Sequence, residues 1–318
     1  MNIGFYKDEE VNGEFMFSPL FEMLASMHVI VKPEHHLDRM KWMEKLMCEI
    51  SGELLEEIRA LSTITDQWNI IMDFAVISPF IELSIPEALI QLEELPLYRI
   101  NKIFRVYGRS VDKHEKSRII KVMKDYYDSV FHHEILYLQP FLIRLLRKEL
   151  ESCRRDGLLP RIGGYHDRLK WNGAEIVFHK RREYHYAVKD LYKIVITAST
   201  YLSPHLMMYE NSGILYLTML VAVEEKKDTV PEDLVSLLKA LGDETRLKLL
   251  REIHSKPAST QALAISLKLT EAAISKHLKL LYQAGLVTKQ RKGNFILYGL
   301  NVNTIDFIQY TLSEFIMR

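Results

Sequence analysis

The sequence is poor in cysteine and glycine, and it has no long apolar segment. Its two cysteines, Cys48 and Cys153, are too few for a dense disulfide framework and are typical of a protein from a reducing cytoplasm. Only 13 of the 318 residues are glycine, which argues against a loop-rich all-β fold. The longest uncharged apolar segment, Gly213 to Val223, is too short to span a bilayer. No basic region followed by an apolar stretch opens the chain, so we expect no signal peptide and a cytoplasmic protein.

Motifs of catalysis, nucleotide binding and metal binding are also missing. The only double glycine, Gly163-Gly164, lacks the lysine of a phosphate-binding loop, and no Gly-x-Ser-x-Gly motif is present. Carboxylates are abundant, but no spacing singles out an acid/base pair. The densest histidine groups are His35-His36 and His132-His133-Glu134, and adjacent helical residues point in different directions. The sequence therefore predicts no catalytic residues, no cofactor and no metal site.

Charge is distributed unevenly along a chain whose overall composition is that of a globular protein. Hydrophobic residues make up 48% and charged residues 26%, and the length suits about two domains. Lys+Arg and Asp+Glu are equal at 42 each, yet residues 239–295 hold eleven basic and four acidic residues, leaving 31 basic and 38 acidic elsewhere. A basic module on an acidic body indicates an attached nucleic-acid-binding domain. Composition alone does not distinguish such a domain from an ordinary fluctuation of surface charge along the chain.

A polar run over residues 224–231 predicts a linker between a first domain (1–223) and a second (232–318). Helical spacing in the first domain continues to about residue 170, with prolines 79, 86, 96 and 140 between helices; the predicted helices are Phe21–Val31, His36–Leu61, Val111–Ile135 and Phe141–Arg154. The two cysteines lie in such patterns, so both are expected to be buried. Later β-branched and aromatic runs predict strands at Glu175–His179, Lys193–Thr200, His205–Tyr209 and Ile214–Val221.

The fold class predicted from these patterns is α+β and predominantly helical. The turn Asn211-Ser212-Gly213 joins the last two predicted strands and suggests that the first domain carries a small antiparallel sheet. Aromatic and methionine residues of this domain either pack in the core or line an apolar ligand pocket, and core packing is the expected role; they are Tyr98, Phe104, Tyr107, Tyr126, Tyr127, Met207 and Met208.

The second domain has the punctuation of a winged helix-turn-helix. Helices are predicted over Pro231–Leu241 and Glu244–His254, with Asp243 as the N-cap of the second. Ser259 can cap a short helix ending at Leu267, and Thr270 caps a helix running to Ala284, closed by Gly285. Two helices joined by so tight a turn form a helix-turn-helix. Strands at Leu286–Gln290 and Phe295–Leu300, joined by the basic Arg291-Lys292-Gly293-Asn294, then form a wing.

The helix after Thr270 has two different faces. Ile274, Leu278 and Leu281 form an apolar stripe, and the opposite face carries Ala272, Ser275, Lys276, Lys279 and Gln283. Small, hydroxyl, amide and basic side chains suit a helix that enters the major groove of DNA. An ordinary surface helix would show a similar face, but the tight turn before it and the basic hairpin after it favour DNA binding.

Two sequence blocks in this domain, residues 241–250 (LGDETRLKLL) and 274–287 (ISKHLKLLYQAGLV), resemble the ArsR/SmtB winged-helix repressors from about Leu234 to Leu300. The resemblance implies a dimeric transcription regulator that contacts DNA through Thr270, Glu271, Ser275, Lys276 and Lys279, and through Arg291, Lys292 and Asn294 of the wing. Residues 256–264 contain no cysteine and residues 303–318 no histidine, so metal sensing at either family site is not expected. Residues 18–23 and 33–36, together with His28, resemble an uncharacterised domain found ahead of such modules.

The last segment, Thr304 to Met317, places apolar residues on one helical stripe after the wing has closed its sheet. We expect this stripe to form the dimer interface: Ile305, Ile308, Leu312, Phe315 and Ile316. Folding of the stripe back onto the first domain is the alternative.

The sequence as a whole predicts a cytoplasmic homodimeric transcription regulator, a repressor, that binds a palindromic site in double-stranded DNA. Its first domain would assist dimerisation, sense a small-molecule effector, or do both. The alternative is an enzyme or metabolite-binding protein whose winged helix serves mainly for assembly.

Overall fold

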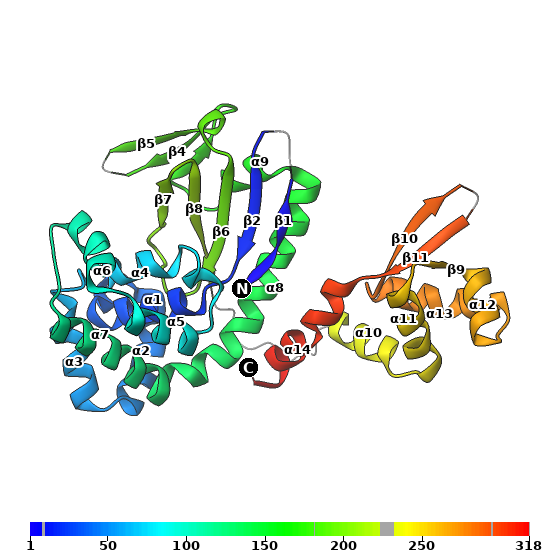
Figure 1. Ribbon diagram of the computed structural model, residues 1–318, viewed down its shortest axis with the longest axis horizontal. Coiled ribbons are helices and arrows are strands. Elements are labelled where there is room, and N and C mark those ends of the chain that lie inside the picture. Colours follow the sequence, from blue (N-terminus) through cyan, green and yellow to red (C-terminus); the bar gives the residue numbers. More distant parts are fainter. Residues whose placement is uncertain (8–9, 181, 223–231, 294, 318) are drawn as a thin grey trace. The chain divides into compact units, whose positions relative to one another are not determined.

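The computed structural model describes residues 1–7, 10–180, 182–222, 232–293 and 295–317. The chain divides into two compact units, Met1–Val223 and Glu224–Arg318, both visible in Figure 1. The predicted fold class is confirmed: helices predominate, and each unit also contains antiparallel strands. The predicted linker at 224–231 lies outside the described residues. Within the described ranges, no helix is long and apolar enough to cross a membrane.

The first unit is built around α1 (Pro19–Val31), in which every residue from Pro19 to Ile30 is buried. Ser18 caps it by accepting a hydrogen bond from the Phe21 backbone N–H at 3.2 Å. A helix that is buried all round belongs in the middle of a core. The other helices of this unit are α2 (Met40–Glu49), α3 (Gly52–Ser62), α4 (Asn69–Ala75), α5 (Ile85–Glu94), α6 (Leu97–Phe104), α7 (Lys113–Tyr126), α8 (His132–Asp156) and α9 (Leu158–Ile162).

Two predicted helix boundaries are wrong. The segment His36–Leu61 is interrupted at Ile50-Ser51, because the Ser51 side chain caps α3 by accepting from the Leu54 backbone N–H. Pro140 does not separate helices but lies inside α8. Burial of Leu138, Phe141 and Leu142 against the core stabilises a continuous helix there despite the hydrogen bond that proline removes.

The main sheet of the first unit is larger than predicted and is mixed, with the strand order β1-β2-β6-β8-β7. Its strands are β1 (Asn2–Tyr6), β2 (Asn12–Met16), β6 (Lys193–Ser199), β7 (Met208–Asn211) and β8 (Ile214–Leu220). The predicted hairpin between β7 and β8 is confirmed. The expectation of a purely antiparallel sheet is wrong, because the buried β6 pairs in parallel with both β2 and β8. A separate antiparallel sheet contains β3 (Leu169–Trp171), β4 (Glu175–His179) and β5 (Glu183–Ala187).

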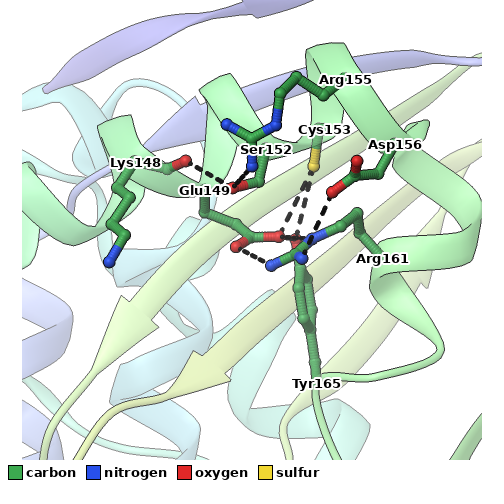
Figure 2. Close-up of polar contacts among 8 residues, drawn as sticks. All are labelled: Lys148, Glu149, Ser152, Cys153, Arg155, Asp156, Arg161 and Tyr165. Atoms are coloured by element: carbon green, nitrogen blue, oxygen red, sulfur yellow. Dashed lines mark hydrogen bonds and ion pairs between the residues drawn. The ribbon is translucent and has the colours of Figure 1, made fainter.

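An ion pair between the buried Glu149 and the half-buried Arg161 connects α8 to α9 (Figure 2). Arg161 donates two hydrogen bonds to the Glu149 carboxylate, at 2.8 and 2.5 Å, and the Tyr165 hydroxyl donates a third at 3.0 Å. Cys153 lies beside them, with its Sγ 3.7 Å from Glu149 Oε1. Burial, with the Glu149 charge second, raises the pKa of this thiol to about 12, so Cys153 is a packing residue and not a reactive nucleophile.

Burial of the remaining singled-out side chains is only partly as predicted. Cys153 is buried as expected, whereas Cys48 is exposed. In α2 only Met43 and Leu46 are buried, and Cys48 lies on the side of the helix away from them. Phe104 and Tyr126 are core residues. Tyr98 on α6 is 70% exposed, and Tyr107, Met207 and Met208 line a cavity instead of packing in the core.

The second unit has the predicted order of a winged helix. Its elements are α10 (Glu232–Leu241), α11 (Glu244–Ser255), β9 (Ala258–Ser259), α12 (Thr260–Leu267), α13 (Glu271–Gln283), β10 (Val287–Lys292), β11 (Phe295–Leu300) and α14 (Val302–Met317). The three predicted caps Asp243, Ser259 and Thr270 each accept from a backbone N–H three residues later. The short strand β9, which the sequence analysis missed, pairs with β11.

Candidate nucleic-acid interface

The pair α12 and α13 is joined by a turn of three residues, Lys268 to Thr270. Lys268 adopts the left-handed conformation at φ 54°, and the Leu269 backbone N–H donates to the Ala264 carbonyl at 3.0 Å, which closes α12. Thr270 Oγ1 then accepts from the Ala273 backbone N–H at 3.2 Å and starts α13. These local bonds fix the angle at which α13 leaves the turn.

One face of α13 holds it to the unit and the other is free. Ile274, Leu278 and Leu281 are fully buried in a core that also contains Leu249, Ile253 and Leu263. The five positions predicted to contact DNA are all exposed: Thr270, Glu271, Ser275, Lys276 and Lys279. Ala272 and Gln283 are exposed beside them. The helix therefore presents short and basic side chains on a rigid support.

The wing is the hairpin of β10 and β11, paired in register from Val287↔Leu300 to Lys292↔Phe295. Arg291 and Lys292 are exposed at the end of β10, and Gly293 makes the turn at φ +61°. Asn294 lies outside the described residues. Lys289 is a further exposed cation of this strand that the sequence analysis did not single out; its Nζ lies 3.9 Å from the centre of the Tyr282 ring. The alternation of side chains along the strand could have identified it.

The cations on this surface differ in what they contact. Arg246 donates to the backbone carbonyls of Ala240 and Lys239 at 2.6 and 2.7 Å, so it stabilises the end of α10. The Arg246 backbone N–H donates to Asp243 and lowers the pKa of that carboxyl. Lys276, Lys279, Arg291 and Lys292, in contrast, have no carboxylate within ion-pair distance among the described residues. Their charges are available to an outside anion.

The predicted stripe on α14 is divided. Ile305 and Ile308 pack against the core of their own unit, and Leu312 is half-buried. Phe315 and Ile316 are 40% and 68% exposed. The first half of the helix is therefore used for packing within the unit, and the apolar surface lies toward its end.

Comparisons with known proteins place this surface in context. A family described as "Helix-turn-helix domain" matches residues 241–290. The "Transcriptional repressor SdpR" of Bacillus subtilis (strain 168) is 33% identical over 79 residues, which are 24% of this chain and 88% of that repressor. The "Arsenical resistance operon repressor" of the same organism is 31% identical over 85 residues, 26% of this chain and 81% of the repressor. A solved "ArsR-like Transcriptional Regulator from Rhodococcus sp. RHA1" is 35% identical, covers 25% of this chain and 76% of its own, and has a TM-score of 0.24.

Proposed function

The chain belongs to the ArsR family of winged helix-turn-helix transcription regulators, and from this premise we propose that it is a repressor that binds a palindromic operator as a homodimer. The observation that carries the proposal is the divided surface of α13. Its buried stripe fixes the helix, while the exposed residues Ser275, Lys276 and Lys279 are free to enter the major groove.

Each part of the surface has its own role in this proposal. Ser275 and Lys279, one helical turn apart, reach base edges, and Lys276 binds phosphate. Thr270 and Glu271 stand at the helix N-terminus, where the backbone N–H groups favour a phosphate. Arg291, Lys292 and Asn294 of the wing contact the backbone of the flanking DNA. Repression follows if the bound protein occupies the site that a polymerase needs.

The proposed dimer uses the exposed end of α14. Leu312, Phe315 and Ile316 present an apolar surface there, whereas Ile305 and Ile308 link the helix to the core of its own unit. Two units related by a two-fold axis would read half-sites about one helical turn of DNA apart, about 34 Å, or a multiple of it. The first unit would contribute effector sensing, and binding of an effector would change operator affinity by thermodynamic linkage.

The test is selection of genomic DNA fragments by the full-length protein, followed by fluorescence anisotropy with a selected duplex and a scrambled one. We expect the selected fragments to share an imperfect palindrome and to bind about a thousandfold or more tighter than scrambled DNA. The paired substitution Lys276→Ala and Lys279→Ala should weaken both, while Lys121→Ala on α7 of the first unit should change neither. Equal affinity for selected and scrambled DNA would contradict the proposal.

A further inference from the structure

The first unit contains a cavity of about 440 Å³, within the size range of small-molecule sites. Its wall is made by the last turn of α1, by α4, by the edge strand β7 and by the loop that precedes β7. In Figure 1, β7 lies at the end of the sheet nearest α4 and α6. Residues far apart in the sequence, such as His28, Asp73 and His205, thus share one wall.

A run of unusual backbone forms part of this wall. Asp66, Gln67 and Trp68 are consecutive non-glycine residues in the left-handed region, with φ of 50°, 58° and 71°. Trp68 is fully buried, and its Nε1–H donates to the Ile58 carbonyl at 3.3 Å. Asp66 lines the cavity. Such conformations are unfavourable and are retained at ligand clamps and switch regions. The cavity beside this turn is therefore a candidate ligand site.

His28 lines the cavity, and His36 is fully buried with its ring against that of His28; each ring presents a hydrogen-bond acceptor. His28 Nδ1 lies 2.8 Å from the Gln67 carbonyl and His36 Nδ1 lies 2.7 Å from the Ser203 carbonyl. A carbonyl only accepts, so both Nδ1 atoms carry the proton. Burial lowers the pKa of His28, and lowers that of His36 to about 4, so both rings are neutral and their Nε2 atoms keep a lone pair. His36 Nε2 is buried without a partner, but His36 does not line the cavity, so the acceptor of the wall is His28.

These imidazoles are not arranged as a metal site. The His36 ring centre is 5.3 Å from that of His28 and 5.3 Å from that of His205. Although these rings lie close together, no group of three or more His, Cys, Asp or Glu side chains in the described part of the chain is placed to hold a metal ion. The lone pair of His28 Nε2 is therefore available to a hydrogen-bond donor of a ligand.

The two carboxylates of the cavity differ in how their charge is compensated. Asp66 pairs with Arg109 at 3.2 Å. Asp73 accepts a hydrogen bond from the Tyr107 hydroxyl at 2.8 Å but has no cationic partner among the residues described, and burial raises its pKa. A partly buried carboxylate without a cation is unfavourable until a positive ligand approaches.

The remaining lining suits an apolar body that carries a cation. Met72, Met207 and Met208 supply flexible thioethers, and the Tyr107 and Tyr209 rings can face an ammonium. Lys180, the cation of the wall, lies with its Nζ 4.8 Å from the centre of the Phe178 ring, and burial lowers its pKa, which disfavours its charged form.

We propose that this cavity binds an organic amine, with the ammonium group donating to Asp73 and to the acceptor wall at His28, and with its apolar body against the methionines and tyrosines. That the amine acts as an effector rests on the proposed repressor function. Binding of the amine does not, because every group used lies in the first unit.

The test is isothermal titration calorimetry of the full-length protein with phenethylamine and hexylamine, and with the matched acids phenylacetate and hexanoate. We expect both amines to bind and neither acid to do so. Asp73→Asn keeps the side-chain shape and should weaken amine binding at least about tenfold, since it removes a charge-assisted bond. Asp128→Asn, the same change at an exposed position, should have no effect.

The proposal is overturned if neither amine binds, if the acids bind instead, or if Asp73→Asn binds the amines as well as the unaltered protein. Circular dichroism of the Asp73→Asn variant verifies that it is folded. Anisotropy with the selected operator, with and without amine, separates the two proposals. An amine that binds without changing operator affinity refutes the effector role alone, and a failure to bind any operator refutes the repressor function while the amine site stands.

Discussion

Local caps are present in both units, but the polar bonds that matter most for the candidate surface of each unit differ in how far along the chain they reach. In the second unit the caps bind backbone N–H groups three residues away, as Thr270 does with Ala273 and Asp243 with Arg246. In the first unit the buried polar groups find partners far along the chain: Glu22 accepts from the Thr200 backbone N–H at 2.9 Å, and His36 bonds the Ser203 carbonyl. Hydrogen bonds between near neighbours produce a surface that a short sequence motif can describe. Contacts between residues far apart in the sequence produce a cavity that no short motif describes.

The two units also differ in where their charged side chains lie. The second unit leaves Lys276, Lys279 and the wing cations exposed, where they can meet an outside polyanion. The first unit encloses Glu22, Glu134 and Glu149, which must be stabilised internally. Substitutions in the first unit should therefore change stability, and substitutions on the DNA-facing surface of the second should change binding.

The largest effect is expected from Arg161→Gln, which leaves the Glu149 carboxylate without its cation. Removing one partner of a buried pair costs about 3 kcal/mol or more, and the partial exposure of Arg161 keeps the expected loss near the lower value. Tryptophan fluorescence during urea unfolding reports on the first unit, because Trp42, Trp68 and Trp171 all lie there. Lys121→Gln, which breaks the exposed pair with Asp125, should cost less than about 0.5 kcal/mol. Equal losses in the two variants would remove the distinction between buried and exposed charge.

A nearly equal effect is expected from pH. Folding lowers the pKa of His36 from 6.5 to about 4, so below 6.5 the unfolded chain binds a proton that the folded unit does not. The stability of the first unit should therefore fall as the pH is lowered from 6.5 toward 4, by about 2 kcal/mol at about pH 5 from this group alone. His36→Asn keeps a donor for the Ser203 carbonyl and should lose that part of the dependence. If urea midpoints of the two proteins change in parallel with pH, His36 does not titrate in this way.

On the DNA-facing side, Ser275→Ala and Lys279→Ala should change sequence preference. Loss of one base contact costs about 1–3 kcal/mol at the base pair concerned, and the urea unfolding of the first unit should stay as it is. Anisotropy with duplexes altered one base pair at a time measures the effect. A uniform loss on selected and scrambled DNA would mean that these side chains contact only the backbone.

The smallest effect is expected from the wing. Arg291→Ala with Lys292→Ala should weaken binding to all sequences alike and make the slope of log affinity against log salt shallower by about one to two units. An unchanged slope would place the wing outside the interface.

How much could be predicted from the sequence follows the same division. Asp243, Ser259, Thr270 and Gly285 mark helix ends through bonds to near neighbours, so the elements of the second unit were predictable almost to the residue. The strands β1 and β2 were not, because β1 pairs only with β2, and β2 gains its second partner, β6, only across the whole first unit. The cavity wall joins Asp66 and Asp73 to His205 for the same reason. The placement of Tyr107 and Met208 at that wall could not be separated from core packing by composition.

The stoichiometry of the operator complex tests the account most directly. Sedimentation of the full-length protein with a selected duplex, and with a duplex carrying one half-site, counts the chains on each DNA. The account predicts two chains on the full site, tight binding lost on the half-site, and loss of the dimer when Leu312, Phe315 and Ile316 at the exposed end of α14 are replaced by serine. One chain on the full site at saturation would contradict it.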